Sequence, residues 1–148
     1  DVEVLKKAVT YQSKETLKIS QKDFDCLVKN IFHEAGVESY EGKIAVAQVT
    51  LNRLKSGRWG NAICSVVFAK AQFSWTLDKK RVRMNPSGQL WDKSVKVAHE
   101  FVHTGKRVKG LETSGFYHTD YIQRPDWAKT KKVAHKIGQH IFYKGVDA

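Results

Sequence analysis

The clearest helical pattern in the chain runs over residues 21–35. Its apolar side chains recur at intervals of three and four, at Phe24, Leu27, Val28, Ile31, Phe32 and Ala35. That spacing places them on one face of a helix. Ser20 is a suitable N-cap with Asp23 three residues later, and Gly36 follows the last apolar position. The pattern therefore predicts an amphipathic helix that begins after Ser20 and ends at Gly36.

Two further helices are predicted. The first covers residues 40–56, with Ser39 as its N-cap. Its stretch 44–51 is apolar on nearly all sides, so we expect this helix to pass through the centre of the domain. The second covers residues 89–104, where Leu90, Trp91 and the apolar positions that follow show amphipathic spacing. These helices indicate a mostly helical domain.

The remaining segments carry weaker patterns. Residues 1–18 are charged with scattered apolar positions, which favours a helix lying over the main body. We therefore expect an N-terminal helical extension over residues 1–20 and one domain over residues 21–148. Residues 58–76 indicate a short helical turn followed by extended chain, 77–89 a loop, and 106–128 irregular structure. Residues 133–143 fit a β-hairpin turning at Gly138, with a helix as the alternative. The predicted fold class is α+β, mostly helical, with a small β element.

Composition narrows the class of protein. A chain of 148 residues fits one domain, and 41% hydrophobic residues supply enough apolar surface for a core. No apolar run approaches the roughly 18 residues that a membrane span needs. Cys26 and Cys64 are too few for a disulfide scaffold or a four-cysteine zinc module. These two cysteines could form a disulfide or remain small buried thiols.

Charge is the first positive clue to function. Lys and Arg number 26 against 15 Asp and Glu, which gives a formal net charge of +11. This excess favours a polyanionic partner such as nucleic acid, an acidic membrane face or an anionic cell-wall polymer. A nucleic-acid-binding module is therefore one alternative. The chain contains no recognisable motif for it, and the basic clusters do not share a helical face, so nucleic acid is not the expected partner.

Glu34 is the residue that stands out in the first helix. It lies seven positions after Leu27 and three after Ile31, so its carboxyl group falls on the apolar face. Burial raises the pKa of a carboxyl group, and a carboxyl that stays protonated near neutral pH can act as general acid in glycosidic bond cleavage. The alternative is a glutamate in the last turn that reaches solvent or pairs with a nearby Lys or Arg.

Four ordered blocks around Glu34 and beyond resemble one family. They are Glu34-Ala35-Gly36-Val37-Glu38 with Tyr40 to Arg53, Cys64 to Phe68 with Gln72-Phe73-Ser74, Pro125-Asp126-Trp127, and Ile137 to Tyr143. Together they cover about residues 24–143 and resemble the SleB/CwlJ-type cell-wall hydrolase family. Gly36-Val37 departs from the family, which has Arg-Gly there, so any role of that arginine is missing or supplied elsewhere.

The resemblance implies a lysozyme-like domain that cleaves the N-acetylmuramic acid to N-acetylglucosamine bond of peptidoglycan. Several members are lytic transglycosylases, and the first glutamate of the motif, here Glu34, is their catalytic residue. The implied partner is the glycan strand of bacterial peptidoglycan, and no cofactor is implied. We expect a monomer that acts in the bacterial cell wall or periplasm. A short, basic chain without wall-anchoring repeats favours a phage endolysin over a secreted bacterial protein.

Two mechanisms remain open at this stage. A lytic transglycosylase needs one carboxyl group, because the 6-hydroxyl of the sugar itself attacks. A hydrolytic muramidase uses a second carboxylate to activate water, and Glu38 is the first candidate for it. Glu38 could equally favour the start of the next helix through its charge.

Other candidate substrate-binding residues come from two segments. Gln72, Phe73 and Ser74 combine an amide, a ring and a hydroxyl that suit a sugar, although Phe73 could be a core residue. Tyr117, His118 and Trp127 belong to an irregular segment of the kind in which binding residues concentrate, although Trp127 could also fill the core. We predict that these six side chains and Glu38 contact the glycan.

A zinc enzyme is the remaining alternative. His99-Glu100-Phe101-Val102-His103 matches the pattern His-Glu-x-x-His, in which two histidines on one helical face bind zinc and the glutamate acts as base. The pattern is short, and no third ligand follows it in a clear position. We therefore predict that the protein binds no metal.

Overall fold

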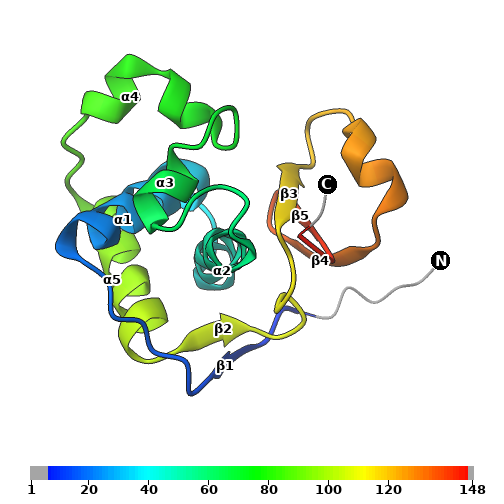
Figure 1. The fold of residues 1–148 in the computed structure, drawn as a ribbon, viewed down its shortest axis with the longest axis horizontal. Coiled ribbons are helices and arrows are strands. Elements are labelled where there is room, and N and C mark those ends of the chain that lie inside the picture. The colour runs from blue at the N-terminus through cyan, green and yellow to red at the C-terminus, as the bar shows by residue number, and fades with distance from the viewer. Residues whose placement is uncertain (1–6, 147–148) are drawn as a thin grey trace.

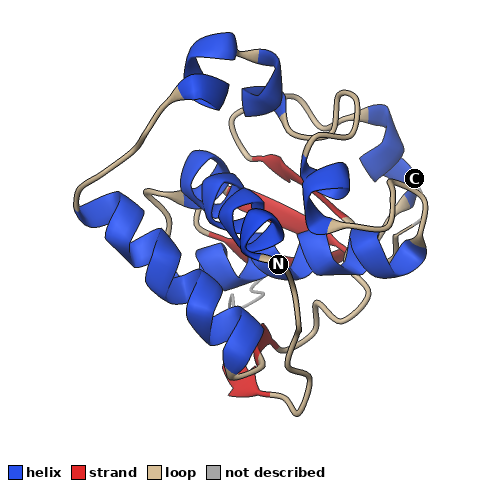
Figure 2. Ribbon diagram, turned by 60° about the vertical axis from the view of Figure 1, so that its left-hand side comes forward, coloured by secondary structure: helices blue, strands red, loops and turns tan. Residues whose placement is uncertain are grey.

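The structure is a computed structural model in which residues 7–146 are described. Its α-helices are α1 (Gln21–Ala35), α2 (Tyr40–Ser56), α3 (Ile63–Val67), α4 (Lys79–Arg83) and α5 (Gln89–His103), and its short 3-10 helices are η1 (Ser74–Leu77) and η2 (Asp126–Thr130). The strands are β1 (Thr10–Gln12), β2 (Lys106–Val108), β3 (Phe116–Thr119), β4 (Val133–Ile137) and β5 (His140–Tyr143). Helices dominate (Figure 2), and the strands of the described residues form two small sheets. The α+β class predicted from the sequence is confirmed.

Helix α2 is the centre of the fold, as its apolar sequence predicts. Ile44, Val46 and Val49 are 0% exposed, and α1, α3 and α5 surround the helix (Figure 1). The Ser39 side chain accepts a hydrogen bond from the Gly42 backbone N–H at the start of the helix. No helix among residues 7–146 is both long enough and apolar enough to cross a membrane.

Polar side chains on α2 hold the chain that leads into β3. The Gln48 amide accepts a hydrogen bond from the Val108 backbone N–H and donates one to the Val108 carbonyl. Asn52 donates to the carbonyls of Leu111 and Ser114, both at 2.9 Å. Because these hydrogen bonds join the central helix to the segment at several points, the position of β3 is fixed relative to the helical core.

The strands form two antiparallel sheets. In one, β1 pairs with β2; in the other, the order is β3-β5-β4. The hairpin predicted over residues 133–143 is confirmed, with its turn at Gly138 and Gln139 between β4 and β5. The larger sheet stands beside the helices (Figure 1), so a helical part and a sheet part face each other.

The helix predicted over residues 1–18 is wrong for the part that the structure describes. Residues 7–20 contain no helix: they form β1 and then an extended segment, while residues 1–6 lie outside the described residues. The physical reason is the local period. From Ser13 to Ser20, partly buried and exposed positions alternate with a period of two, which suits extended chain. The Leu17 N–H donates to the Val102 carbonyl, so this segment lies along α5.

The segment between α2 and α5 also differs from its prediction. The short helix α3 is present, but the chain after it folds into turns and η1 instead of remaining extended. The predicted loop 77–89 contains α4, whose start is capped by the Asp78 side chain. The Trp75 indole N–H donates to Asn30 Oδ1 on α1, at 2.9 Å. This buried hydrogen bond fixes η1 against the first helix.

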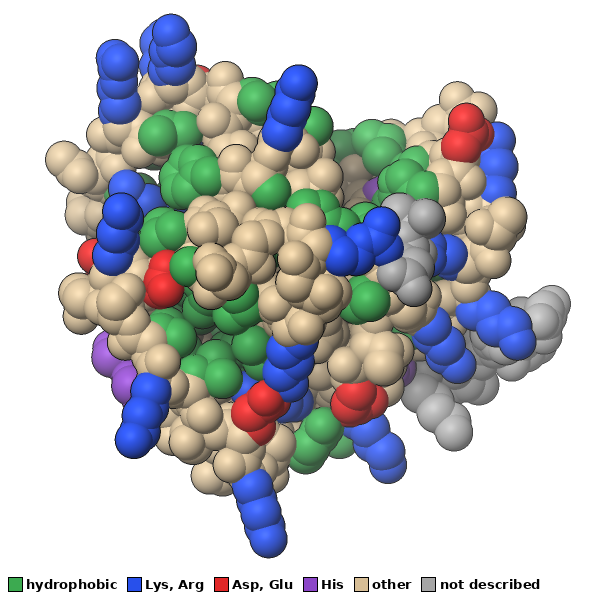
Figure 3. All heavy atoms as spheres, viewed as in Figure 1, with side chains coloured by type: hydrophobic (Ala, Val, Ile, Leu, Met, Phe, Trp, Pro, Cys, Tyr) green, Lys and Arg blue, Asp and Glu red, His purple; other side chains and the backbone are tan. Residues whose placement is uncertain are grey.

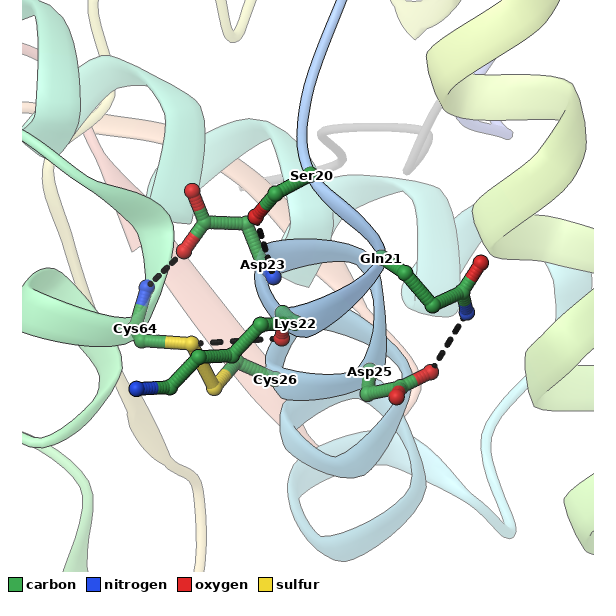
Figure 4. Close-up of a disulfide and its surroundings, with 7 residues drawn as sticks. All are labelled: Ser20, Gln21, Lys22, Asp23, Asp25, Cys26 and Cys64. Atoms are coloured by element: carbon green, nitrogen blue, oxygen red, sulfur yellow. Dashed lines mark hydrogen bonds between the residues drawn. A yellow bond between two sulfur atoms is a disulfide. The ribbon is translucent and has the colours of Figure 1, made fainter.

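The two cysteines form a disulfide between α1 and α3. Cys26 and Cys64 are bonded, and the Asp23 side chain accepts a hydrogen bond from the Cys64 backbone N–H beside them (Figure 4). The bond joins positions 38 residues apart. It therefore ties the helix that carries Glu34 to the segment that precedes Gln72.

Candidate active site

A cleft of about 490 Å³ lies between the helical part and the larger sheet. One wall comes from the end of α1 and the chain from Ala71 to Arg81, and the other from β3, the loop that follows it and His140. The lining residues are His33, Glu34, Ala71, Gln72, Ser74, Leu77, Arg81, Tyr117, His118, Thr119, Tyr121, Ile122, Pro125, Trp127 and His140. Glu34 is the only carboxyl side chain among them.

Glu34 has the protonation behaviour expected of an acid catalyst. Burial raises the pKa of its carboxyl group, while the hydrogen bond from Tyr117 and the charges of Arg81 and Arg53 act in the opposite direction. The net effect is a raised pKa, because desolvation is the largest of these effects. The carboxyl is therefore protonated over a wider pH range than an exposed glutamate.

Tyr117 on β3 is the direct partner of Glu34. Its hydroxyl donates to Glu34 Oε1 across 83 positions of sequence. Burial, with Glu34 as the next cause, raises the pKa of Tyr117 well above its ordinary value, so its proton stays in place. The ring lies 5.1 Å from that of Phe142 and 4.9 Å from that of His140, between ring centroids. Neighbouring rings thus hold the hydroxyl against the carboxyl group.

Arg53 is a buried cation beneath the cleft that sequence reasoning did not assign to the site. It is 3% exposed and its Nε donates to the Gly115 carbonyl at 2.7 Å. The guanidinium carbon lies 4.8 Å from the ring centroid of Phe73 and 5.1 Å from that of Phe116. Its charge lowers the pKa of Glu34 and so limits the rise that burial causes. Its place at the end of the block from Tyr40 to Arg53 was the available signal.

His33 and Arg81 are two further lining residues that the sequence did not single out. Burial is the main reason that the pKa of His33 falls to about 4, so the imidazole is neutral near pH 7. Its ring stacks on Trp75 at 4.5 Å between centroids. Arg81 donates to the His33 carbonyl at 3.2 Å and brings a positive charge to Glu34. Adjacency to Glu34 was the only signal for His33.

The structure brings five of the predicted substrate-binding residues together in the cleft: Gln72, Ser74, Tyr117, His118 and Trp127. His118 is held by the Tyr143 hydroxyl, 2.8 Å from its Nε2. Trp127 is partly exposed and lies edge-on to Tyr143 at 5.3 Å between centroids.

Two of the predicted residues lie elsewhere. Phe73 is 1% exposed and belongs to the core, where extended backbone turns it inward under Arg53. Glu38 does not line the cleft, because its carboxylate accepts a hydrogen bond from the Gln139 backbone N–H at 3.0 Å and is held at the hairpin turn. Neither side chain lines the cleft, so the prediction that both contact a ligand there is wrong.

His99 and His103 lie on the outer side of α5, away from the cleft. Their rings stack at 5.4 Å between centroids, and Phe24 lies against both. Glu100 accepts a hydrogen bond from the Tyr40 hydroxyl at 2.8 Å. Within residues 7–146, no group of three or more His, Cys, Asp or Glu side chains is placed to hold a metal ion. The histidine pair therefore lacks a third protein ligand in the described part of the chain.

Comparison with known proteins shows the family. Residues 37–143 match the Cell Wall Hydrolase family model, and the chain belongs to this family. Glu34 lies just before the matched range. The chain is 31% identical over 128 residues to a spore cortex-lytic enzyme of Oceanobacillus iheyensis, covering 84% of this chain and 42% of that protein. A spore cortex-lytic enzyme of Bacillus subtilis is 29% identical over 83% of this chain and 38% of its own length. The chain thus spans less than half of the curated relatives it matches.

Solved structures show the same fold. The catalytic domain of the Bacillus cereus SleB protein superposes with a TM-score of 0.66 at 25% identity, over 89% of this chain and 98% of that one. The catalytic domain of the germination-specific lytic transglycosylase SleB from Bacillus anthracis gives the same TM-score and identity, over 88% and 100%. The lysozyme-like α+β fold expected from the resemblance is confirmed. The expected phage origin finds no support in these relatives, which are bacterial spore enzymes.

Proposed function

We propose that this protein degrades bacterial peptidoglycan by cleaving the N-acetylmuramic acid to N-acetylglucosamine bond as a lytic transglycosylase. The observation that carries the proposal is the carboxyl group of Glu34, which is buried enough for its pKa to rise. No second Asp or Glu of residues 7–146 lines the cleft. One carboxyl group is sufficient when the substrate supplies its own nucleophile. Family membership and the Bacillus anthracis lytic transglycosylase domain support the same reaction.

In the first step, the protonated Glu34 donates its proton to the glycosidic oxygen. The bond between C1 of the muramic acid and that oxygen breaks, and the glucosamine leaves with a free hydroxyl. Positive charge develops at C1 of the muramic acid as in other glycosidases. The Tyr117 hydroxyl, already donating to Glu34, stabilises the carboxylate that forms.

In the second step, the Glu34 carboxylate takes the proton from the 6-hydroxyl of the same muramic acid. The oxygen of that hydroxyl then forms a bond to C1. The product is a 1,6-anhydro ring, and Glu34 is protonated again. Attack within one molecule has a high effective concentration, so no bound water is required. The lining aromatic rings, among them Trp127 and Tyr121, offer faces and edges that can contact the sugars on either side of the cleavage point.

Hydrolysis with Glu38 as a second carboxylate is the less favoured mechanism. The Glu38 carboxylate is committed to the hairpin turn and does not line the cleft. We further propose that the protein acts as a monomer in the bacterial cell wall, with neither cofactor nor nucleic acid as a partner. The Lys and Arg side chains spread over the face in Figure 3 instead of forming one binding patch, which suits an extended anionic polymer.

The test is Glu34→Gln against Glu38→Gln, with purified peptidoglycan as substrate and mass analysis of the fragments. Glu34→Gln keeps the side-chain volume and removes the proton, so turnover should fall about 100-fold or more. Glu38→Gln should retain most of the activity. Wild-type fragments should end in anhydromuramic acid, each one water lighter than a reducing end.

Two outcomes would contradict this mechanism. A Glu34→Gln protein that clears peptidoglycan at a tenth of the wild-type rate or faster would remove Glu34 as the acid. Ordinary reducing muramic ends that carry heavy oxygen from labelled water would show a hydrolase. Thermal unfolding of both variants controls for the fold, and Glu34→Gln should be no less stable at neutral pH because it removes a carboxyl whose ionisation burial disfavours.

A further inference from the structure

A second pocket, outside the cleft, has an unusual set of charges. It has a volume of about 600 Å³ and lies between the start of α2, one face of α5 and β2. Four lysines line it: Lys43, Lys93, Lys96 and Lys106. No ion pair within 4.0 Å joins any of them to a carboxylate of the described residues, although such pairs hold Lys55, Lys129 and Lys136 elsewhere. Lysines outnumber carboxylates in its lining, so the pocket holds an excess of positive charge.

Lys43 is the most telling of these residues. It is only 4% exposed, and within residues 7–146 its ammonium group donates to one partner, the Glu38 carbonyl, at 2.5 Å. An ammonium group has three N–H donors, and burying it without a carboxylate partner is costly. Burial and the nearby Lys93 lower its pKa, and the charge of Glu38 offsets only part of that fall. A negatively charged ligand in the pocket would offset both effects.

The pocket also contains negative charge, and this selects among anions. Glu38 and Glu100 line it, with Tyr40 donating to Glu100. A polyphosphate would be repelled by both carboxylates. A peptide that carries carboxylates together with a free amine meets groups of both signs. The mixed lining thus favours a zwitterionic peptide over a phosphate polymer.

The pocket and the cleft adjoin through the hairpin turn. Glu38 lines the pocket and accepts the Gln139 backbone N–H, while the next residue, His140, lines the cleft. Burial lowers the pKa of His140, and the charge of Glu38 acts in the opposite direction. A peptide attached to a sugar in the cleft has a reach of up to about 13 Å if its four residues are extended.

We propose that the pocket formed by Lys43, Lys93, Lys96 and Lys106 binds the peptide stem of peptidoglycan through its carboxylates. The inference rests on the proposed function, because the glycan bearing the stem must occupy the cleft. It makes the protein selective for muramic acid residues that carry peptides. Lys93 and Lys96 would contact the stem at the rim and Lys43 at the base of the pocket.

The experiment compares two double variants on two substrates. Lys93→Gln/Lys96→Gln removes two exposed pocket charges, and Lys14→Gln/Lys18→Gln removes two exposed charges that line no described pocket. Each is assayed on glycan strands that carry stems and on strands freed of stems by an amidase. The pocket variant should lower the kcat/KM preference for stem-bearing strands about fivefold, the loss expected for two partly exposed ion pairs. The control should keep the wild-type preference.

A binding measurement separates this inference from the proposed function. Free stem tetrapeptide is titrated into the Glu34→Gln protein by calorimetry, which requires no turnover. Binding that the pocket double variant weakens and the control variant does not would support the stem site even if the glycosidase mechanism failed. An equal loss in both variants would overturn it. So would an effect of the pocket variant that disappears when phosphate polymers are stripped from whole walls, because the ligand would then be the phosphate.

Discussion

Removing the Tyr117 hydroxyl should shift the pH dependence of the enzyme in a direction that the structure determines. In Tyr117→Phe the ring keeps its contacts with Phe142 and His140, but Glu34 loses the hydrogen bond that lowers its pKa. Burial, which raises the pKa, is then less opposed. The pKa of Glu34 should rise further, because the ionised form is the one that the hydroxyl stabilises.

The magnitude follows from the energy of the lost hydrogen bond. A hydrogen bond to a charged group contributes about 1.5–3 kcal/mol. Part of this is also lost from the protonated form, so we expect the ionised form to lose about 1 kcal/mol or more relative to the protonated form, which raises the pKa of Glu34. The alkaline limb of kcat/KM should therefore move to higher pH, since it reports loss of the acid. The maximal rate should fall about tenfold or more because the carboxylate formed during cleavage is less stable.

The assay is the clearing of a peptidoglycan suspension over a range of pH. The matched control is Tyr11→Phe, which also removes a tyrosine hydroxyl that donates to a glutamate, here Glu112 at 2.9 Å and outside the cleft. Its profile should overlay that of the wild type. An alkaline limb that stays in place or moves down in Tyr117→Phe would refute the reasoning, provided that thermal unfolding shows the fold intact.

Three further predictions concern stability and encounter with the substrate. The disulfide closes a span of 38 positions, so its reduction should lower the free energy of unfolding by about 4 kcal/mol, the chain-entropy value for a loop of this length. An unchanged denaturant midpoint would contradict this prediction. Ala71 has a φ of 60°, and this left-handed backbone is less favourable for a residue with a Cβ than for glycine. Ala71→Gly should therefore raise the free energy of unfolding by up to about 1 kcal/mol, and a drop in the melting temperature would refute this. Activity on whole walls should decrease as the salt concentration rises, because the net charge of +11 attracts the anionic wall and salt screens this attraction. Activity on short neutral glycans should change little, and an equal response of both substrates would show that the charge serves another purpose.

The local pattern of the sequence determined the helical framework. The intervals of three and four over residues 21–35 gave α1 with its cap at Ser20, and the run of apolar residues after Ser39 gave the buried α2. Both depend on contacts within one or two turns, which residue spacing encodes directly. The same spacing placed Glu34 on the inner face of α1, where the structure finds it. Its raised pKa follows from that burial.

Segments without a strong period were decided by the rest of the fold. The charged stretch before Ser20 is not a helix in its described part, because its backbone bonds to β2 and α5. Whether Cys26 and Cys64 are bonded also depended on tertiary structure, since the helices that carry them must meet first. In both cases the deciding partners are far away in the sequence, where local propensity carries no information.

The site itself was only partly present in the sequence. Glu34 could be found from its spacing, but its partner Tyr117 comes from 83 positions away, and the two meet only because α2 holds the chain that leads into β3. The exclusion of Glu38 follows from its hydrogen bond at the hairpin turn. The sequence by itself therefore determined the helix that presents Glu34 and the inward position of this proposed acid. The tertiary structure decided which groups surround that acid, because cleft geometry and desolvation arise from contacts between distant segments.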